Sequence, residues 1–250
     1  MTLAGWIRLA LVIALFAALE VACRTGLIDR LTVIPPSEMI AALWGILASG
    51  SANADIAYTL TNTLVAILCA VLVGFAAGGI IHALPRLRRV LDPLLTSYYA
   101  VPIFAFYPLL VLIFGVTATP LIVIGALFGM VSMLTSTLLG FDRIPPVMAK
   151  AATVLGLGPL RALLLIRLPA TLPHLITGLK MTVVYCVIAV IAAEFILSPK
   201  GLGFKIAFAY NNFDNRTMYG LLLLLITAVT LVVLLLHHIE QRIHDRWARR

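Results

Sequence analysis

The chain has little charge. Only 11% of its 250 residues are Asp, Glu, Lys or Arg, whereas 62% are hydrophobic; an average soluble domain has about 25% charged residues. The 18 basic and 10 acidic side chains are too few to cover a soluble protein of this size without leaving large apolar patches. The same balance excludes a disordered or low-complexity chain. The composition therefore predicts an integral membrane protein.

Cysteine is also scarce. The three cysteines, Cys23, Cys69 and Cys186, stand singly inside apolar stretches, without the even count or paired spacing of a disulfide framework or a zinc site. The five histidines do not have the spacing of metal ligands either, and they lie at the ends of apolar stretches or in the tail, at His82, His174, His237, His238 and His244. We expect no metal site and read the cysteines as small buried residues.

Several catalytic motifs are missing from the sequence. It contains no His-Glu-x-x-His, no Gly-x-Ser-x-Gly and no pair of aspartates inside an apolar stretch, which argues against a membrane enzyme. It also contains no Gly-x-x-x-x-Gly-Lys-Ser/Thr and no Gly-Lys pair, so the chain does not hold nucleotide phosphates by that route. We therefore expect no catalytic residue and no cofactor bound by this chain.

The apolar stretches are long enough to cross a bilayer, which takes about 20 mainly apolar residues per helix. They predict six membrane-spanning helices, at about 6–23, 56–83, two within 93–141 around a turn at 115–120, 175–197 and 217–239. The first is the weakest, because Arg8 and Glu20 lie inside it. Without it the count is five, and a cleaved signal peptide is then the alternative. Glu20 argues against cleavage and favours an uncleaved helix.

The positive charges predict the orientation, since Lys and Arg concentrate in short cytoplasmic loops. With a cytoplasmic N-terminus, twelve of the 18 basic residues fall inside, at Arg8, Arg86, Arg88, Arg89, Arg143, Lys150, Arg161, Arg167, Arg242, Arg246, Arg249 and Arg250. Five fall outside, and Lys180 lies within a span. Both termini are therefore expected in the cytoplasm, and because the bases gather between apolar runs we expect no nucleic-acid partner.

Three regions follow from this pattern: residues 1–53, with the first span and a helix at the outer membrane surface; a domain at 54–240 that holds the other spans; and a basic tail at 241–250. The surface helix is predicted from Ile34-Pro35-Pro36-Ser37-Glu38, a helix-start signal with Ser or Glu placed for capping, followed by the short apolar stretch 39–47. Ser49-Gly50-Ser51 predicts its exit.

The long cytoplasmic connection at 141–174 predicts two short helices, 147–155 and 160–168. Gly156-Leu157-Gly158-Pro159 separates them, and Pro169 and Pro173 are expected to bend the chain back into the membrane. Five apolar side chains on this helix pair would be exposed to water unless the pair docks with a partner. They are Met148, Val154, Leu155, Leu157 and Leu160. A helix pair lying on the membrane surface is the alternative.

At this segment the chain resembles the permease subunits of binding-protein-dependent ABC importers. Their signature is matched by Lys150-Ala151-Ala152-Thr153-Val154-Leu155-Gly156 followed by Ile166-Arg167-Leu168-Pro169. Further motifs resemble the sulfonate, taurine, nitrate and bicarbonate branch, over about Thr32 to Trp247: Ile34-Pro35-Pro36-Ser37-Glu38, Asp92-Pro93, Pro102, Pro108-Leu109, Phe114-Gly115, Gly178-Leu179-Lys180, Ala193-Glu194 and Gly201-Leu202-Gly203. Two residues depart from the family pattern. Lys150 stands where the signature has a Glu, which reverses the charge. Lys180 stands where the family usually has an Arg, which keeps the charge but loses the bidentate hydrogen bonding of a guanidinium.

The resemblance implies a type I ABC importer transmembrane fold in the bacterial inner membrane, surrounded by lipid. It implies a non-catalytic subunit that pairs with a second copy of itself or a homologous permease. A cytoplasmic ATPase dimer would use ATP and Mg, and an extracytoplasmic binding protein would deliver the solute. The connection 141–174 would then couple the chain to the ATPase and is called the coupling segment below. The ATPase-coupling residues would be Lys150, Ala151, Ala152, Leu155, Gly156, Leu160 and Arg161.

The resemblance also bounds the solute. It points to a small anion of the sulfonate, taurine, nitrate, bicarbonate or aromatic carboxylate type. A vitamin precursor carried by the same machinery is the alternative. An ion-coupled carrier is disfavoured, because such carriers usually have more spans, internal repeats and midplane charge.

Polar residues within the spans suggest where a pathway could run. The candidates are Tyr98, Tyr99, Ser132, Thr135, Ser136 and Glu194, although Ser and Thr hydroxyls often bond their own backbone. Lys180 and Glu194 have either a structural role, with Lys180 bound to lipid phosphates and Glu194 fixing the loop 200–205, or a role in the pathway. Pro102 and Pro108 are expected to kink the third span. Close helix packing is expected at Gly74, Gly78, Gly125 and Gly129.

Overall fold

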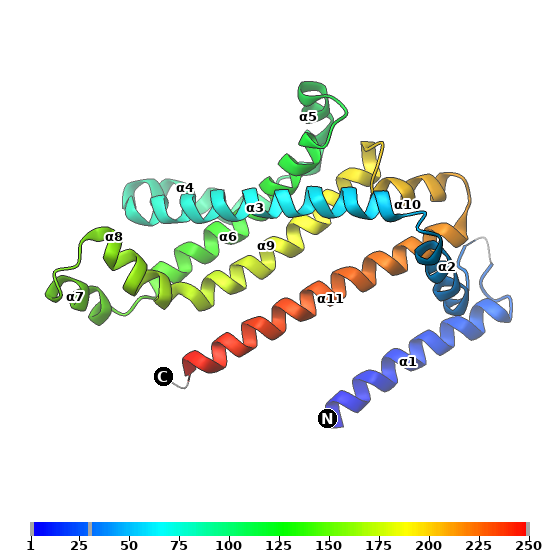
Figure 1. Cartoon of the computed structure of the whole chain (residues 1–250), viewed down its shortest axis with the longest axis horizontal. Coiled ribbons are helices and arrows are strands. Elements are labelled where there is room, and N and C mark those ends of the chain that lie inside the picture. Colours follow the sequence, from blue (N-terminus) through cyan, green and yellow to red (C-terminus); the bar gives the residue numbers. More distant parts are fainter. Residues whose placement is uncertain (1–2, 30–31, 249–250) are drawn as a thin grey trace. The chain divides into compact units, whose positions relative to one another are not determined.

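The computed structural model describes residues 3–29 and 32–248, and every regular element in them is a helix (Figure 1). The prediction of an all-α chain is confirmed. Five helices are long: α1 (Leu3–Arg24), α3 (Asn53–Ala83), α6 (Thr119–Asp142), α9 (Leu168–Leu197) and α11 (Asn215–Ala248). The shorter elements are α2 (Pro36–Ser49), α4 (Pro85–Ser97), η1 (Tyr98–Ala100), η2 (Ile103–Phe106), α5 (Tyr107–Phe114), α7 (Pro146–Val154), α8 (Pro159–Ala162), η3 (Leu163–Arg167) and α10 (Leu202–Asn211).

Four stretches of helix in the described residues are long and apolar enough to cross a membrane: Asn53–Ala83, Thr119–Asp142, Leu163–Leu197 and Asn215–Arg242. A fifth crossing results if the bent pair Pro85–Ala100 and Ile103–Phe114 counts as one span. The predicted turn at 115–120 lies where α5 ends and α6 begins. The count of six needs α1 as well, and its 22 residues extend about 33 Å at 1.5 Å per residue. The six-span count stays a prediction.

The bent pair contains one of the two kinks that the sequence predicts in the third span. The two helical parts meet at 84°, and Val101 and Pro102 form the break between η1 and η2. Pro108 does not kink a helix: it is the second residue of α5, where a missing N–H costs no helical hydrogen bond. The prediction is confirmed for Pro102 and wrong for Pro108.

The predicted gap between the second short helix, ending at 168, and the fifth span, beginning at 175, is also wrong. The helix continues through both prolines from Leu163 to Leu197. Just before Pro169, η3 is a π-helix in which the Leu168 N–H donates to the carbonyl of Leu163, five residues back. A wider turn of this kind lets a helix absorb groups that break the regular hydrogen-bond ladder. The fifth span therefore begins earlier than the predicted Leu175.

The start of α2 differs from the predicted cap. Pro35 occupies the N-cap position, and no side chain caps the helix. Ser37 instead bonds to the Glu20 carboxylate of α1, through its hydroxyl at 2.7 Å and its N–H at 3.0 Å. At the other end Gly50, with φ +67°, closes the helix and its N–H donates to the Leu47 carbonyl, as the predicted loop exit requires.

The chain divides into two compact units, Met1–Tyr58 with Glu194–Ala228, and Thr59–Ala193 with Val229–Arg250. The first has a core built mainly from α10 and the start of α11, formed by Ala52, Leu202, Ile206, Ala209, Met218 and Leu221. The second has one core where α3 and α9 meet, formed by Ala66, Ala70, Cys186 and Val190. A further core lies between α3 and α6, at Ile81, Leu134 and Leu138.

Glycines let the helices of the second unit approach closely. A Cβ on Gly74 of α3 would lie 2.4 Å from the Met130 carbonyl oxygen of α6, and one on Gly78 would lie 2.7 Å from the Cβ of Thr137. Gly125 and Gly129 place α6 against α9 in the same way, the latter 2.4 Å from the Cys186 sulfur. Side chains larger than hydrogen do not fit at these four positions without movement.

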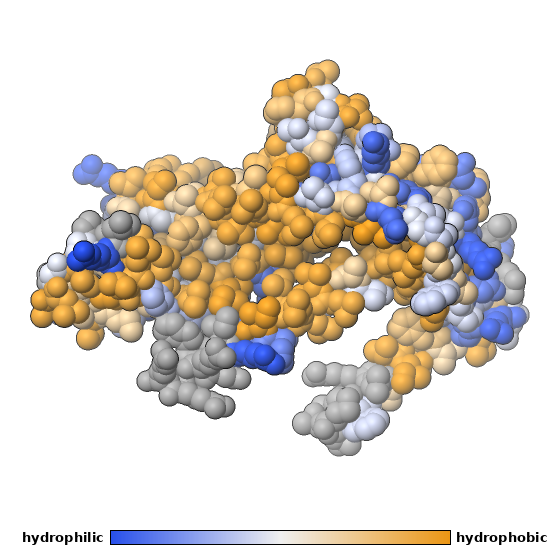
Figure 2. All heavy atoms as spheres, in the orientation of Figure 1, coloured by the Kyte–Doolittle hydropathy of each residue, from blue (hydrophilic) through white to orange (hydrophobic). Residues whose placement is uncertain are grey.

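The outward side of α3 carries a row of leucines at intervals of four residues, Leu60, Leu64, Leu68 and Leu72, all exposed. Its opposite side, with Ala66, Ala70, Gly74 and Gly78, is buried. Hydrophobic residues cover much of the visible surface in Figure 2. An apolar exterior is what a bilayer requires, so the surface agrees with the composition.

Candidate functional site

The coupling segment leaves α6 at Asp142 and returns through α9, and α7 and α8 lie beyond the ends of those two helices (Figure 1). Gly156 terminates α7 in the left-handed conformation, with φ +59°. The Leu157 N–H donates to the Ala152 carbonyl at 3.0 Å across this turn. This is the hydrogen-bond pattern of a glycine C-cap, so Gly156 sets the sharp reversal between the two short helices.

The predicted coupling residues lie on the outside of this segment. Lys150, Ala151, Gly156 and Arg161 are exposed, Leu155 is 68% exposed and Ala152 is half-buried. The side chain of Leu160 lies outside the described part of the structure. Val147 and Val154 on α7 are 74% and 86% exposed. The solvent-exposed apolar surface expected from the sequence is therefore present.

A shallow groove of about 270 Å³ lies beside α7. It is lined by Met148, Ala151, Leu165, Ile166, Pro169 and Ala170, which come from α7, η3 and the start of α9. All six side chains are apolar, so the groove suits an apolar contact and offers no group for chemistry. A partner helix or loop could bury these side chains.

An ion pair fixes the entry to the coupling segment, and sequence reasoning missed it. Arg88 of α4 donates two hydrogen bonds to Asp142, the last residue of α6, from Nη1 to Oδ1 at 2.7 Å and from Nη2 to Oδ2 at 2.6 Å. His82 Nδ1 lies 3.2 Å from the same carboxylate, and Asp92 lies 3.7 Å from Arg88 Nε. Bidentate pairs of this kind fix orientation as well as distance. The pair connects α4, and hence the broken span, to the residue from which the coupling segment starts.

Tyr98 and Tyr99 lie at the break of the bent span. The Tyr98 hydroxyl donates to the Leu127 carbonyl of α6 at 2.9 Å. The ring of Tyr99 meets Phe128 of α6 edge-on at 5.8 Å between centroids, and lies 5.2 Å from the ring of Tyr185 of α9. Tyr99 keeps an exposed edge, so of the two it is the better candidate for a pathway surface.

The hydroxyl residues of α6 mainly serve their own helix. The Thr135 hydroxyl donates to the Val131 carbonyl at 2.9 Å, and the Thr137 hydroxyl donates to the Met133 carbonyl at 2.7 Å. Ser132 is buried. Ser136 packs on Gly178 of α9, where an added Cβ would lie 2.5 Å from the Ser136 Cβ. These contacts favour packing over pathway lining at these positions.

Glu194 is completely buried and lies against the loop that leads into α10. Its Oε2 accepts a hydrogen bond from the Gly203 N–H at 3.0 Å. Gly201, with φ +105°, packs directly on the carboxylate, since a Cβ there would lie 2.4 Å from its Cδ. These contacts support the structural alternative for Glu194, which fixes the loop 198–203.

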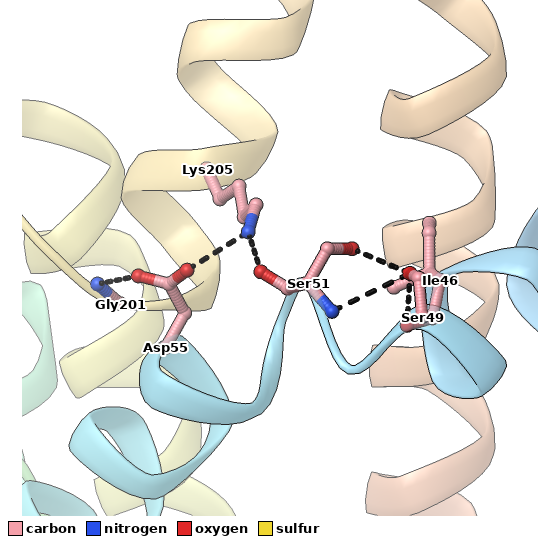
Figure 3. Close-up of polar contacts among 6 residues, drawn as sticks. All are labelled: Ile46, Ser49, Ser51, Asp55, Gly201 and Lys205. Carbon is pink, nitrogen blue, oxygen red and sulfur yellow. Dashed lines mark hydrogen bonds and ion pairs between the residues drawn. The ribbon is translucent and has the colours of Figure 1, made fainter.

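A second carboxylate holds the same loop (Figure 3). Asp55, in the first turn of α3, accepts the Gly201 N–H at 3.0 Å, and its other oxygen lies 3.1 Å from Lys205 Nζ. Lys205 also donates to the Ser51 carbonyl. Asp55 and Glu194 thus satisfy two backbone N–H groups at the start of α10, where negative charge is favoured.

Lys180 has a protein partner. Its Nζ lies 2.5 Å from Oε2 of Glu240 on α11, and the Thr177 hydroxyl donates to the other oxygen of that carboxylate. Both charged side chains are about 15% exposed. The expectation that Lys180 binds lipid phosphates is therefore not supported, because its charge is already paired within the chain.

Comparisons with known proteins identify the family of this chain. Residues 66–249 match the family model described as "Binding-protein-dependent transport system inner membrane component". The chain is 34% identical over 174 residues, 69% of its length, to the taurine transport system permease protein TauC of Escherichia coli (strain K12), and spans 59% of that protein. It is 32% identical over 183 residues, 73% of its length, to the nitrate import permease protein NrtB of Leptolyngbya laminosa, and spans 64% of that relative.

The fold also matches a solved structure. A chain of the MetNI methionine ABC transporter in an inward-facing conformation aligns with a TM-score of 0.63 and 19% sequence identity, covering 74% of this chain and 93% of that one. At this identity the likeness shows the fold alone, which is that of a type I importer permease. The chain belongs to the family of binding-protein-dependent transport system inner membrane components.

Proposed function

We propose that this chain forms one half of the translocation pathway of an ATP-driven importer, together with a second copy of itself or a homologous permease. A cytoplasmic ATPase dimer docks on the coupling segment and hydrolyses ATP with Mg, while an extracytoplasmic binding protein delivers the solute. The observation that supports this proposal most is the exposed apolar surface of α7, with Val147, Val154 and Leu155. A subunit without a partner would leave this surface in water.

The proposed topology has six spans, with α1 as the first and both termini in the cytoplasm. It places Val154 of the coupling segment and Phe213, which precedes α11, on opposite sides of the membrane. Both residues are more than 80% exposed, so a cysteine at either position should react with a water-soluble maleimide. We expect labelling of Phe213→Cys from outside intact spheroplasts and of Val154→Cys only after lysis. The unmodified chain is the control: its Cys23 and Cys186 are buried, and any labelling of the partly exposed Cys69 would be seen there too. Labelling of Val154→Cys from outside would overturn the orientation.

The proposed solute is a small anion of the sulfonate, taurine, nitrate, bicarbonate or aromatic carboxylate type. The names of the relatives TauC and NrtB support this class. Lys180 is engaged by Glu240, and Glu194 is engaged by the α10 loop. Neither is available as a selective charge on the pathway, so the binding protein would make most of the selection.

Co-purification tests the proposed machinery. The chain would be extracted in a mild detergent through an affinity tag, and the retained proteins identified by mass spectrometry. We expect a soluble protein containing Gly-x-x-x-x-Gly-Lys-Ser/Thr to be retained in a stoichiometric amount. Its reproducible absence would favour a gradient-driven carrier. The ligand that co-purifies with the partner binding protein tests the solute class, and a vitamin precursor there would contradict the proposed anion.

A further inference from the structure

The coupling segment carries positive charge that the chain itself does not balance. There is no Asp or Glu between Arg143 and Ala193, whereas four basic residues, Arg143, Lys150, Arg161 and Arg167, lie in the segment. All four are exposed. The segment's single carboxylate, Asp142, is occupied by both arms of Arg88. Within the described part of the segment, the four bases are therefore left to pair with something outside the chain.

One of these bases, Lys150, lies within the exposed apolar surface of α7 that the proposed partner would bury. Lys150 is three residues after Val147 and four before Val154 on α7, so the three side chains are neighbours on one side of the helix. Both valines are largely exposed. A partner that buries the valines also surrounds the Lys150 ammonium, and a charge taken out of water is costly unless an opposite charge meets it.

We propose that the ATPase subunit that docks on this segment has an acidic docking groove, with apolar walls for the α7 valines and a carboxylate opposite Lys150. This inference rests on the proposed function and names the chemistry of the partner surface. It makes Lys150 a specificity-determining residue: an ATPase with a basic groove would be repelled by four uncompensated positive charges.

The inner leaflet of the membrane is the other source of negative charge, and cytoplasmic bases attract anionic lipids. Helices that lie on such membranes are rich in Lys and Arg along their polar side. The nine residues of α7 include only one base, and its exposed side is otherwise apolar. The adjoining groove is lined only by apolar residues of α7, η3 and α9. An apolar groove beside the one base of α7, with the other three bases outside this helix, fits a protein surface better than a layer of phosphates.

Binding of the ATPase that co-purifies with this chain tests the proposal. The full-length permease would be placed in phosphatidylcholine nanodiscs, which carry no net lipid charge, and ATPase affinity measured at low and high salt. We expect Lys150→Glu, which restores the residue of the family signature, to weaken binding at least about tenfold at 50 mM KCl and less than about threefold at 500 mM, because salt screens exposed charges. Lys150→Arg is expected to bind within about twofold of the unmodified chain.

A matched control separates the local contact from the overall charge. Lys200 is exposed and lies in a different unit from Lys150, so Lys200→Glu makes the same charge change away from the coupling segment and should leave the affinity unchanged. Equal or tighter binding by Lys150→Glu would overturn the acidic groove while leaving the proposed function intact. A loss seen only after phosphatidylglycerol is added would assign Lys150 to lipid and would also overturn it. Failure of any ATPase to bind the unmodified chain would instead contradict the proposed function.

Discussion

The loop before α10 allows a prediction whose size follows from the structure. Gly201 has φ +105° and ψ 168°, a conformation that costs a residue with a side chain about 1–3 kcal/mol. An added methyl group would also lie 2.4 Å from the buried Glu194 carboxylate, and overpacking of this kind costs about 1–3 kcal/mol. Gly201→Ala should therefore destabilise the protein by about 4 kcal/mol. At roughly 2–4 °C per kcal/mol for a chain of this size, the midpoint should fall by about 10 °C.

Two other glycines of the same unit are matched controls. Gly26 has φ +77° but no neighbour within 4 Å of an added Cβ, so Gly26→Ala should show only the backbone cost of about 1–2 kcal/mol. Gly45 lies inside α2, also without a neighbour, and Gly45→Ala should be neutral or stabilise by up to about 1 kcal/mol. The three variants separate strain from overlap.

Thermal unfolding in detergent, followed with a thiol-reactive dye, measures this series. Cys23 and Cys186 are almost completely buried, so they should react only when the packing around them opens. Cys69 is partly exposed, so it would be replaced by Ala in every chain of the series. The expected order of midpoints is Gly45→Ala at or above the unmodified chain, then Gly26→Ala, then Gly201→Ala. If Gly201→Ala unfolded at the same temperature as Gly26→Ala, the carboxylate would not be packed on the loop, and the structural role given to Glu194 would be wrong.

Three further predictions concern ionised groups. The Glu194→Gln variant should transport solute normally, since an amide oxygen can still accept the Gly203 N–H. Loss of transport by a stable variant would instead show that Glu194 has a role in the translocation pathway. Lys180→Met should lower stability by about 3 kcal/mol by leaving the Glu240 charge unpaired, and adding Glu240→Met should recover most of the loss in the same dye assay. Arg88→Ala should reduce solute uptake per ATP hydrolysed in proteoliposomes, and the exchange of Arg88 and Asp142 should restore part of it; unchanged coupling in Arg88→Ala would show that the pair does not connect α4 to the coupling segment.

The sequence predicted the helices well where a bilayer dictates them. The length of α3 and the turn before α6 follow from runs of uncharged residues, because a crossing helix needs about 20 of them. The turn at Gly156 was also predictable, since a glycine after a short apolar helix is the usual C-cap. These features depend only on residues close together in the chain.

The features that the sequence did not predict depend on distant residues. Glu240 lies 60 positions after Lys180, and Asp142 lies 54 after Arg88, so only the packing of their helices shows that they pair. The helix end expected near Pro169 differs from the structure for another reason: local rules place a helix end near a proline, whereas η3 forms a π-turn just before Pro169 and the helix continues. That turn has no recognisable signal in the sequence.

In the proposed function, ATP hydrolysis by a docked partner drives solute through this chain. The most direct measurement is solute uptake by proteoliposomes that contain the permease, its co-purified ATPase and the binding protein, with the unmodified chain compared with Gly156→Asp. An added side chain at Gly156 has space, with nothing within 4 Å, but its φ of +59° and the new negative charge should disturb the docking turn. We expect uptake that requires ATP in the unmodified chain, and in the variant an inserted protein without solute-stimulated ATPase activity. Uptake driven by an ion gradient without ATP, or unchanged stimulation in Gly156→Asp, would contradict it.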